Sequence, residues 1–360
     1  MPLNSGVGDG RHRHSTSFGY GMNDRRSAAV DRPIQWHWTF FVLGAVYAVP
    51  AMIVMPFSPT AGLALAVGVI PVAAFDLPGY RRGRRIIPLV GLLSAVGFLT
   101  GSLLTQVPLL AVCAMFGLAV GCTWWARQAR AGALALAVVF PLTGIALSYR
   151  DLAEGALIAV LMLAGSLYAW GVAMLWPERQ VDPPARPPTP TRQEALTYGA
   201  LLGMAAAIAA LLGYVLELEH VGWATGTVLL VMRPGREQLV LRGVGRAASV
   251  VAGAFAAAYL AGVDPPVAVT IATVGLAIAA LAATQGSRWY IAPAFTTYLA
   301  LTLILQGIGE RPGLRFAERA LETLIGVALA LLFGAVIPIL IRAARTASQK
   351  QVSDGQGSGA

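Results

Sequence analysis

A few arginine side chains stand where long apolar runs of this sequence begin, and they are candidate binding groups for an acid. Arg84 and Arg85 open one such run, and Arg246 opens another. The forked donors of a guanidinium, together with the dipole at a helix N-terminus, suit a carboxylate. We therefore predict a carboxylate site at these arginines. The alternative is that each one fixes membrane orientation and binds lipid phosphate.

One acidic residue could carry a proton. Glu322 is the acid deepest in an apolar run, within "ERALETLIG" (318–326), and Arg319 shares its helix face at spacing i, i+3. A carboxyl group in such surroundings is either paired with arginine or protonated, and the protonated form makes it a candidate for proton coupling. The alternative is an ion pair within the helix at the outer interface.

Short or proline-interrupted apolar runs occur in two pairs, at matching places in the two halves of the chain. Such interruptions are the best sequence indication of a binding site in a transporter built from repeats. The alternative is a helix kink without a ligand. The runs are 60–76 with Pro71, 220–232, 131–148 with Pro141, and 289–307 with Pro293.

Aromatic and hydroxyl side chains in these runs complete the predicted substrate site. Trp223 or Tyr290 would contact the ring of an aromatic substrate, and Thr227 and Thr296 would offer hydroxyl groups.

Composition identifies the setting of these residues as a lipid bilayer. Of the 360 residues, 57% are hydrophobic and only 12% are charged, and the mean hydropathy is +0.68. A soluble domain has roughly a quarter of its residues charged. The net charge of +9 therefore indicates membrane topology, and we expect lipids and no nucleic acid as partners.

Twelve apolar runs divide into two sets of six on either side of a proline-rich segment. The sequence predicts an all-α integral membrane protein with about twelve transmembrane helices. The expected runs are 36–57, 60–76, 86–105, 107–125, 131–148, 154–176, 197–216, 220–232, 243–262, 266–284, 289–307 and 316–341.

The basic residues orient these runs. With a cytoplasmic N-terminus, only four of the 26 basic residues fall outside: Arg150, Arg311, Arg315 and Arg319. The positive-inside rule therefore predicts that both termini are cytoplasmic. The expected parts are a tail at 1–33, a six-helix module at 34–177, a linker at 178–195, a second module at 196–342 and a tail at 343–360.

The two modules align as an internal repeat. At an offset of 162, Gly83, Arg84 and Gly91 fall on Gly245, Arg246 and Gly253. Because six is an even number, both modules enter the membrane from the same side. The repeat is therefore predicted to be parallel, with its axis along the membrane normal.

The stretch "HVGWATGTVLLVMRPGREQLVLRGVGRAASVVAG" (220–253) resembles the signature region of the fusaric acid resistance-like (FUSC) family, part of the aromatic acid exporter superfamily. After the second arginine of this stretch, Ser249-Val250 replaces the family's usual Gly-Thr. "RALETLIG" (319–326) is similar to a helix start that recurs in the family. The resemblance implies efflux of small aromatic or other organic acids. The matching residues are His220, Trp223, Ala224, Thr227, Val228, Pro234, Arg242, Arg246, Gly253, Arg319, Glu322, Thr323 and Gly326.

No motif indicates an enzyme. The sequence contains no HExxH, GxSxG or glycine-lysine phosphate loop, so we expect no hydrolase, ATPase or cofactor. "RHRH" (11–14) could hold a metal ion, but without further ligands it is interpreted as part of a solvated tail. No metal site is therefore predicted.

The predicted function is export of small organic anions, with aromatic carboxylic acids favoured, across the inner membrane of a bacterium. A proton gradient is the expected energy source. A passive anion channel and a non-transporting envelope scaffold remain alternatives. A homo-oligomer is possible on the sequence alone.

Overall fold

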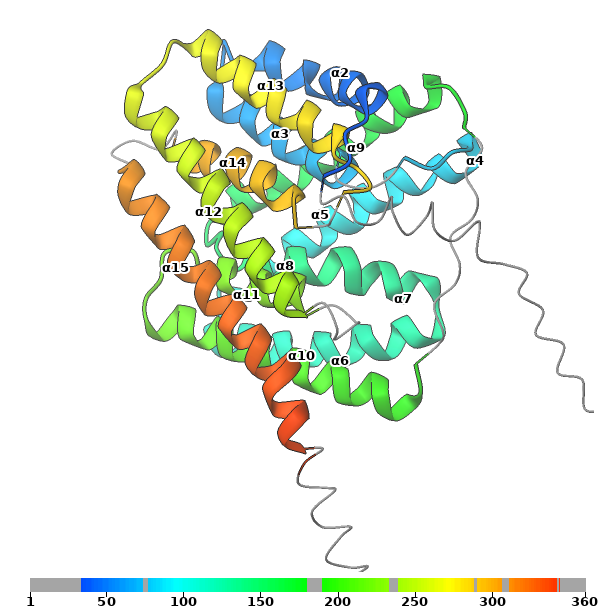
Figure 1. Cartoon of the computed structure of the whole chain (residues 1–360), viewed down its shortest axis with the longest axis vertical. Coiled ribbons are helices and arrows are strands. Elements are labelled where there is room, and N and C mark those ends of the chain that lie inside the picture. The colour runs from blue at the N-terminus through cyan, green and yellow to red at the C-terminus, as the bar shows by residue number, and fades with distance from the viewer. Residues whose placement is uncertain are drawn as a thin grey trace, which may run out of the picture.

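The computed structural model describes residues 34–73, 77–179, 190–232, 239–287, 290–305, 311–341 and 343. All regular elements in these ranges are helices (Figure 1). The predicted N-terminal tail with its "RHRH" segment lies outside the described residues. So do Pro234 and most of the predicted linker and C-terminal tail.

The first half of the chain forms a series of helices at the expected apolar runs. They are α2 (Trp38–Val54), α3 (Pro59–Ala73), α4 (Arg81–Arg84), α5 (Ile86–Leu104), α6 (Pro108–Gln128), α7 (Arg130–Leu134), the π-helical turn η1 (Ala135–Val139), α8 (Phe140–Ala146) and α9 (Leu152–Leu175).

The described residues of the second half also form helices at the expected apolar runs. It consists of α10 (Arg192–Val215), α11 (Val221–Val231), α12 (Leu239–Val263), α13 (Val267–Ala283), α14 (Ala292–Ile304), α15 (Pro312–Leu331) and a second π-helical turn, η3 (Leu332–Val336).

Among the described residues, six helices are long and apolar enough to cross a membrane, and six apolar helices are shorter. The long ones comprise α4 with α5, α6, α9, α10, α12, and α15 with its extension to Ile341. The chain is therefore a multi-pass membrane protein. Helix α11 is among the short ones, as the short apolar run at 220–232 predicts.

Local sequence explains where several helices begin. Asp151 accepts a hydrogen bond from the backbone N–H of Ala153 at 2.8 Å and so caps α9. Thr191 and Glu194 form a capping box at the start of α10. Pro141 lies in the first turn of α8, where its missing N–H is tolerated, and the π-helical turn η1 precedes it.

Equivalent helices make the same contacts in each half of the chain. In the first half α5 packs on α8 and α9, and in the second half α12 packs on α14 and α15. Helix α3 packs on α9 as α11 packs on α15. Contacts between the halves also come in corresponding pairs. Helix α2 packs on α13 as α10 packs on α6. Helix α3 packs on α14 as α11 packs on α8. In Figure 1, α2 and α13 lie at the top, and α6 and α10 lie at the bottom.

The Gly-xxx-Gly pairs Gly97/Gly101 on α5 and Gly199/Gly203 on α10 serve this packing. A methyl group on Gly101 would lie 2.2 Å from the carbonyl oxygen of Thr143, and one on Gly203 would lie 2.9 Å from that of Phe116. Side chains at either position would separate α5 from α8 or α10 from α6. By contrast, Gly117 on α6 has no heavy atom within 4 Å of such a methyl group, so it faces outward.

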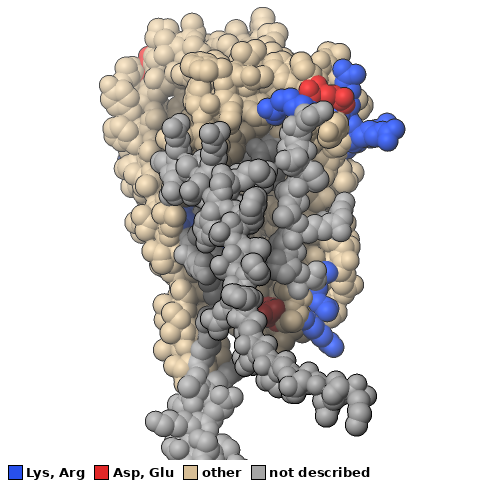
Figure 2. All heavy atoms as spheres, turned by 45° about the vertical axis from the view of Figure 1, so that its right-hand side comes forward, with Lys and Arg blue, Asp and Glu red and all other residues tan. Residues whose placement is uncertain are grey.

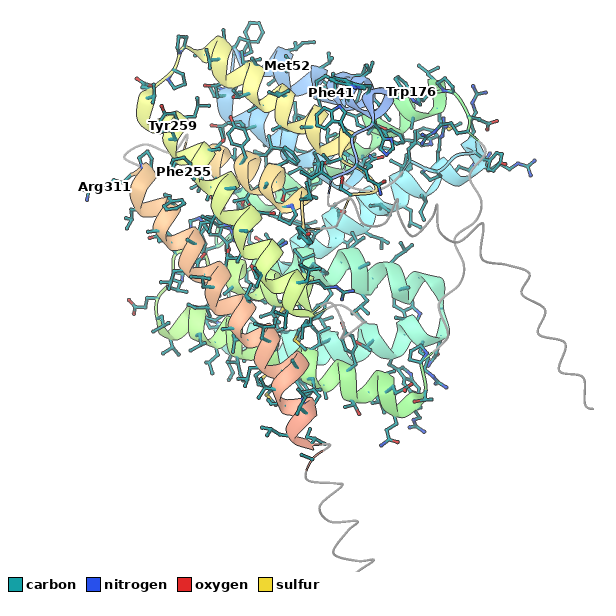
Figure 3. All side chains as sticks on the ribbon, viewed as in Figure 1. Phe41, Met52, Trp176, Phe255, Tyr259 and Arg311 are labelled. Carbon is teal, nitrogen blue, oxygen red and sulfur yellow. The ribbon has the colours of Figure 1, made fainter. Side chains whose placement is uncertain are left out.

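Side chains distinguish the two ends of the helix bundle. Trp176, at the end of α9, and Arg311, just before α15, lie at opposite ends of the molecule (Figure 3). On the face in Figure 2, charged side chains gather in small groups near the edge, and most of the remaining described surface is neither basic nor acidic. Exposed leucine, valine and isoleucine side chains are numerous, as expected for helices that contact lipid.

Candidate functional site

Helix α11 is too short to cross a bilayer and is enclosed by protein. Its eleven residues span about 16 Å, half of the roughly 30 Å of hydrocarbon. All of them except Leu230 are buried. A methyl group on Gly222 would lie 2.2 Å from the carbonyl oxygen of Ile145, so α11 packs directly on the backbone of α8. A buried helix too short to cross the bilayer is a typical element of a binding site in transporters built from repeats.

Three side chains stack where α11 begins. The rings of His220 and Trp223 lie 4.1 Å apart, centroid to centroid, with 17° between their planes. The guanidinium carbon of Arg319, on α15, lies 4.4 Å from the centroid of the Trp223 ring. This cation–π contact connects the two helices. Trp223 is only 5% exposed, so in this conformation its ring is covered by His220, Arg319 and the core.

Arg319 and Glu322 are brought close to one another in the interior, as their spacing predicts, but without an ion pair between them. Glu322 is 2% exposed. The buried atoms Arg319 Nη1 and Glu322 Oε2 have no hydrogen-bond partner among the described residues. Leaving buried charged groups without partners is costly. Such groups in a membrane interior mark a functional site.

An ion-pair cluster borders this site, and the sequence analysis did not single it out. Arg315, which is 7% exposed, forms a bidentate salt bridge with Glu219 and donates a third hydrogen bond to Glu318 at 2.8 Å. The Arg315 guanidinium holds the pKa of Glu219 below its usual value. The cluster joins the segment before α11 to α15. Its sequence signal was the i, i+3 spacing of Arg315 and Glu318.

The Thr227 side chain packs between helices, and its hydroxyl group bonds the backbone of its own helix. Its side chain is fully buried, and Thr227 Oγ1 donates to the carbonyl oxygen of Trp223 at 2.9 Å. Gly326 faces it from α15, where an added methyl group would lie 2.6 Å from Thr227 Cβ. The close approach of these two residues fixes the spacing of α11 and α15.

Arg246 and its neighbour Gly245 lie on α12, and Tyr290 lies just before α14. Arg246 is buried at 7% exposure. A methyl group on the neighbouring Gly245 would lie 2.6 Å from the ring of Tyr290, so this ring lies against α12. Thr296 is half-buried one turn into α14, and its hydroxyl donates to the carbonyl oxygen of Pro293 at 3.3 Å. Arg246 lies on α12, and Tyr290 and Thr296 lie just before and within the start of α14, which packs on α12.

Arg84 and Arg85 differ in their surroundings. Arg84 is fully buried, and its five N–H donors bond backbone carbonyl oxygens. Because a guanidinium has five donors, none remains for a substrate carboxylate. Arg85 is exposed. The acceptors of Arg84 are the carbonyl groups of Pro78, Gly79, Ala173, Trp176 and Pro177, most of them at the C-terminus of α9.

Comparison with known protein families gives a match in the second half of the chain. Residues 207–333 match the family described as fusaric acid resistance protein-like, and this confirms the predicted resemblance for the second half of the chain. The matched segment contains Trp223, Arg246, Arg319 and Glu322. The family is one of membrane transport proteins of the resistance type. No curated protein and no solved structure matches the chain.

Proposed function

We propose that the protein exports small organic anions, with aromatic carboxylic acids as favoured substrates, and that a proton gradient drives the export. The observation that carries this proposal is the pair of half-buried Arg319 and buried Glu322 beside the short helix α11, each with a buried polar atom that has no hydrogen-bond partner among the described residues. An arginine suits a carboxylate, and a buried acid suits a proton. Both lie in the segment that matches a membrane transport family.

The proposal includes twelve membrane spans arranged as two parallel six-helix repeats. The matched packing of α5, α8 and α9 with α12, α14 and α15 supports this arrangement. So does the reciprocal contact of α2 with α13 and of α10 with α6. An axis between the repeats would run along the membrane normal, where equivalent helices of both halves can line one pathway.

Orientation in the membrane is also part of the proposal. Both termini would lie in the cytoplasm of a bacterium, on the side to which α4 and the end of α9 belong. The exposed arginines Arg81, Arg82 and Arg85 at that end support this orientation. Trp176, at the same end, would lie at headgroup level.

The route of the anion would pass Arg246 and Tyr290 on the cytoplasmic side before it reaches Arg319. The ring of Tyr290 lies against Gly245, the residue before Arg246 on α12. An arginine and an aromatic ring on neighbouring segments would suit a carboxylate attached to a ring. Exposed Arg85 would attract anions to the cytoplasmic opening. Arg84 is left out of this route because its donors are all used by carbonyl groups.

The test is uptake of radiolabelled hydroxybenzoate into inside-out vesicles, with and without an imposed proton gradient. We expect uptake that depends on the gradient. Arg246→Gln should reduce it strongly with unchanged expression, whereas Arg82→Gln, at an exposed arginine, should not. Uptake that follows only the membrane potential would replace the carrier by a passive channel. No uptake across a panel of acids would favour a scaffold and refute transport.

A further inference from the structure

Two arginine side chains contact the same tryptophan ring where α6 ends and α10 begins. The guanidinium carbon of Arg127 lies 5.5 Å from the centroid of the Trp124 ring, and that of Arg192 lies 5.3 Å from it. Both contacts are cation–π interactions. Arg127 Nε also donates to the carbonyl oxygen of Pro190 at 3.2 Å. Two positive charges are therefore brought together at the junction of these helices.

The positive charge of this junction is not neutralised within the described part of the chain. No carboxylate there forms a salt bridge with Arg127 or Arg192. Glu194, the acid in the first turn of α10, instead accepts a hydrogen bond from the backbone N–H of Thr191 at 2.8 Å as part of the capping box. Two cations beside one ring repel each other, and an anion that contacts both would remove this repulsion.

The junction lies at the depth of the lipid headgroups. Helices α6 and α10 are both long and apolar enough to cross a membrane, and they pack on each other at the bottom of Figure 1. The end of α6 and the start of α10 thus lie at the same surface of the bilayer. Trp125, next to Trp124, is 48% exposed, and exposed tryptophan side chains at helix ends favour the headgroup level. Phosphate groups of lipids are the anions found at this depth.

We propose that Arg127 and Arg192 bind the phosphate group of an anionic phospholipid, with their guanidinium groups positioned by Trp124. The forked N–H donors of a guanidinium match phosphate oxygens. A headgroup with net negative charge is preferred to a zwitterionic one, because the ammonium group of the latter would add a third cation to the site. The bound lipid would join the first half of the chain to the second at α6 and α10, and this role does not depend on the proposed transport function.

The corresponding junction between α2 and α13 is built differently. There the segments before α2 and after α13 bond directly, since the backbone N–H of Gln35 donates to Ser287 Oγ at 2.8 Å and Ser287 Oγ donates to the carbonyl oxygen of Gln35 at 3.0 Å. The ring of Phe40, on α2, is contacted by the single guanidinium of Arg179 at 4.3 Å. Among the described residues, two arginines share one ring only at the junction of α6 and α10. One bound phospholipid is therefore expected for each chain.

The experiment follows thermal unfolding of the purified full-length protein in detergent as phosphatidylglycerol or phosphatidylcholine is added. A ligand that binds only the folded state stabilises it, so the melting temperature should rise with phosphatidylglycerol and much less with phosphatidylcholine. Each arginine near an anionic headgroup contributes about fivefold to affinity, so the double variant Arg127→Gln/Arg192→Gln should need roughly thirtyfold more phosphatidylglycerol for the same rise. Salt at about 1 M should weaken the effect in the wild type.

The control of equal charge is the double variant Arg81→Gln/Arg82→Gln, at two exposed arginines of α4, which should respond to phosphatidylglycerol as the wild type does. Trp124→Leu should lose the preference for phosphatidylglycerol over phosphatidylcholine, and Trp124→Phe should keep most of it. The proposal is wrong if the two double variants respond alike, because net charge alone would then explain the effect. It is also wrong if inorganic phosphate produces the same rise as phosphatidylglycerol, because the site would then bind free phosphate.

Discussion

Gly326→Ala probes the contact between α11 and α15 with a single methyl group. The added carbon would lie 2.6 Å from both the carbonyl oxygen of Ala224 and the Cβ atom of Thr227, and ordinary contact begins at 3.4 Å. The helices would have to separate by about 0.8 Å, because close-packed interiors cannot absorb the atom otherwise. Overpacking of this kind costs about 1–3 kcal/mol.

The assay is thermal unfolding in detergent together with hydroxybenzoate transport. In a chain of 360 residues, a cost of about 2 kcal/mol lowers the melting temperature by about 3 °C. The separation would also move Trp223 away from Arg319, so transport should fall. Gly313→Ala is the control on the same helix, because its methyl group would have no heavy atom within 4 Å. The reasoning is refuted if Gly326→Ala and Gly313→Ala have the same melting temperature and the same transport rate.

Three further outcomes follow from the described contacts. Arg84→Gln should reduce the yield of folded protein, since each buried carbonyl left unpaired costs about 1–3 kcal/mol. Arg85→Gln, at an exposed position, should fold normally. Equal yields of the Arg84→Gln and Arg85→Gln proteins would show that the bonds of Arg84 to the carbonyl groups at the end of α9 do not stabilise the fold. Glu219→Gln should lower the melting temperature slightly at neutral pH, by removing a partly exposed pair with Arg315 worth at most about 1 kcal/mol. Because the pKa of Glu219 is lowered in the folded protein, this difference should be present above about pH 4.3 and disappear only as the pH falls below that value. Trp223→Phe should retain more transport than Trp223→Ala, because a phenyl ring can still stack on Arg319, and equal losses would show that the stack does not matter.

Much of the helical layout could be predicted from the sequence, because apolar runs and their interruptions are local signals. The short run at 220–232 indeed forms the short helix α11, and the i, i+3 spacing placed Arg319 and Glu322 on one face of α15. The role of Arg84 could not be predicted in this way. Its acceptors Ala173 and Trp176 are 89 and 92 positions away in the chain, and no local pattern reports such a distance.

The sequence by itself determined that this chain is a membrane protein of helices, which segments form them, and which family its second half resembles. These properties depend on composition, periodicity and motifs, which act over a few turns of chain. Only the tertiary structure decided which charged side chains are satisfied. It placed Arg84 among carbonyl groups, paired Arg315 with Glu219, and left Arg319 and Glu322 with open hydrogen-bonding atoms. Whether a charge is satisfied depends on groups that folding brings from distant segments, and the energy of a buried charge is set by those groups.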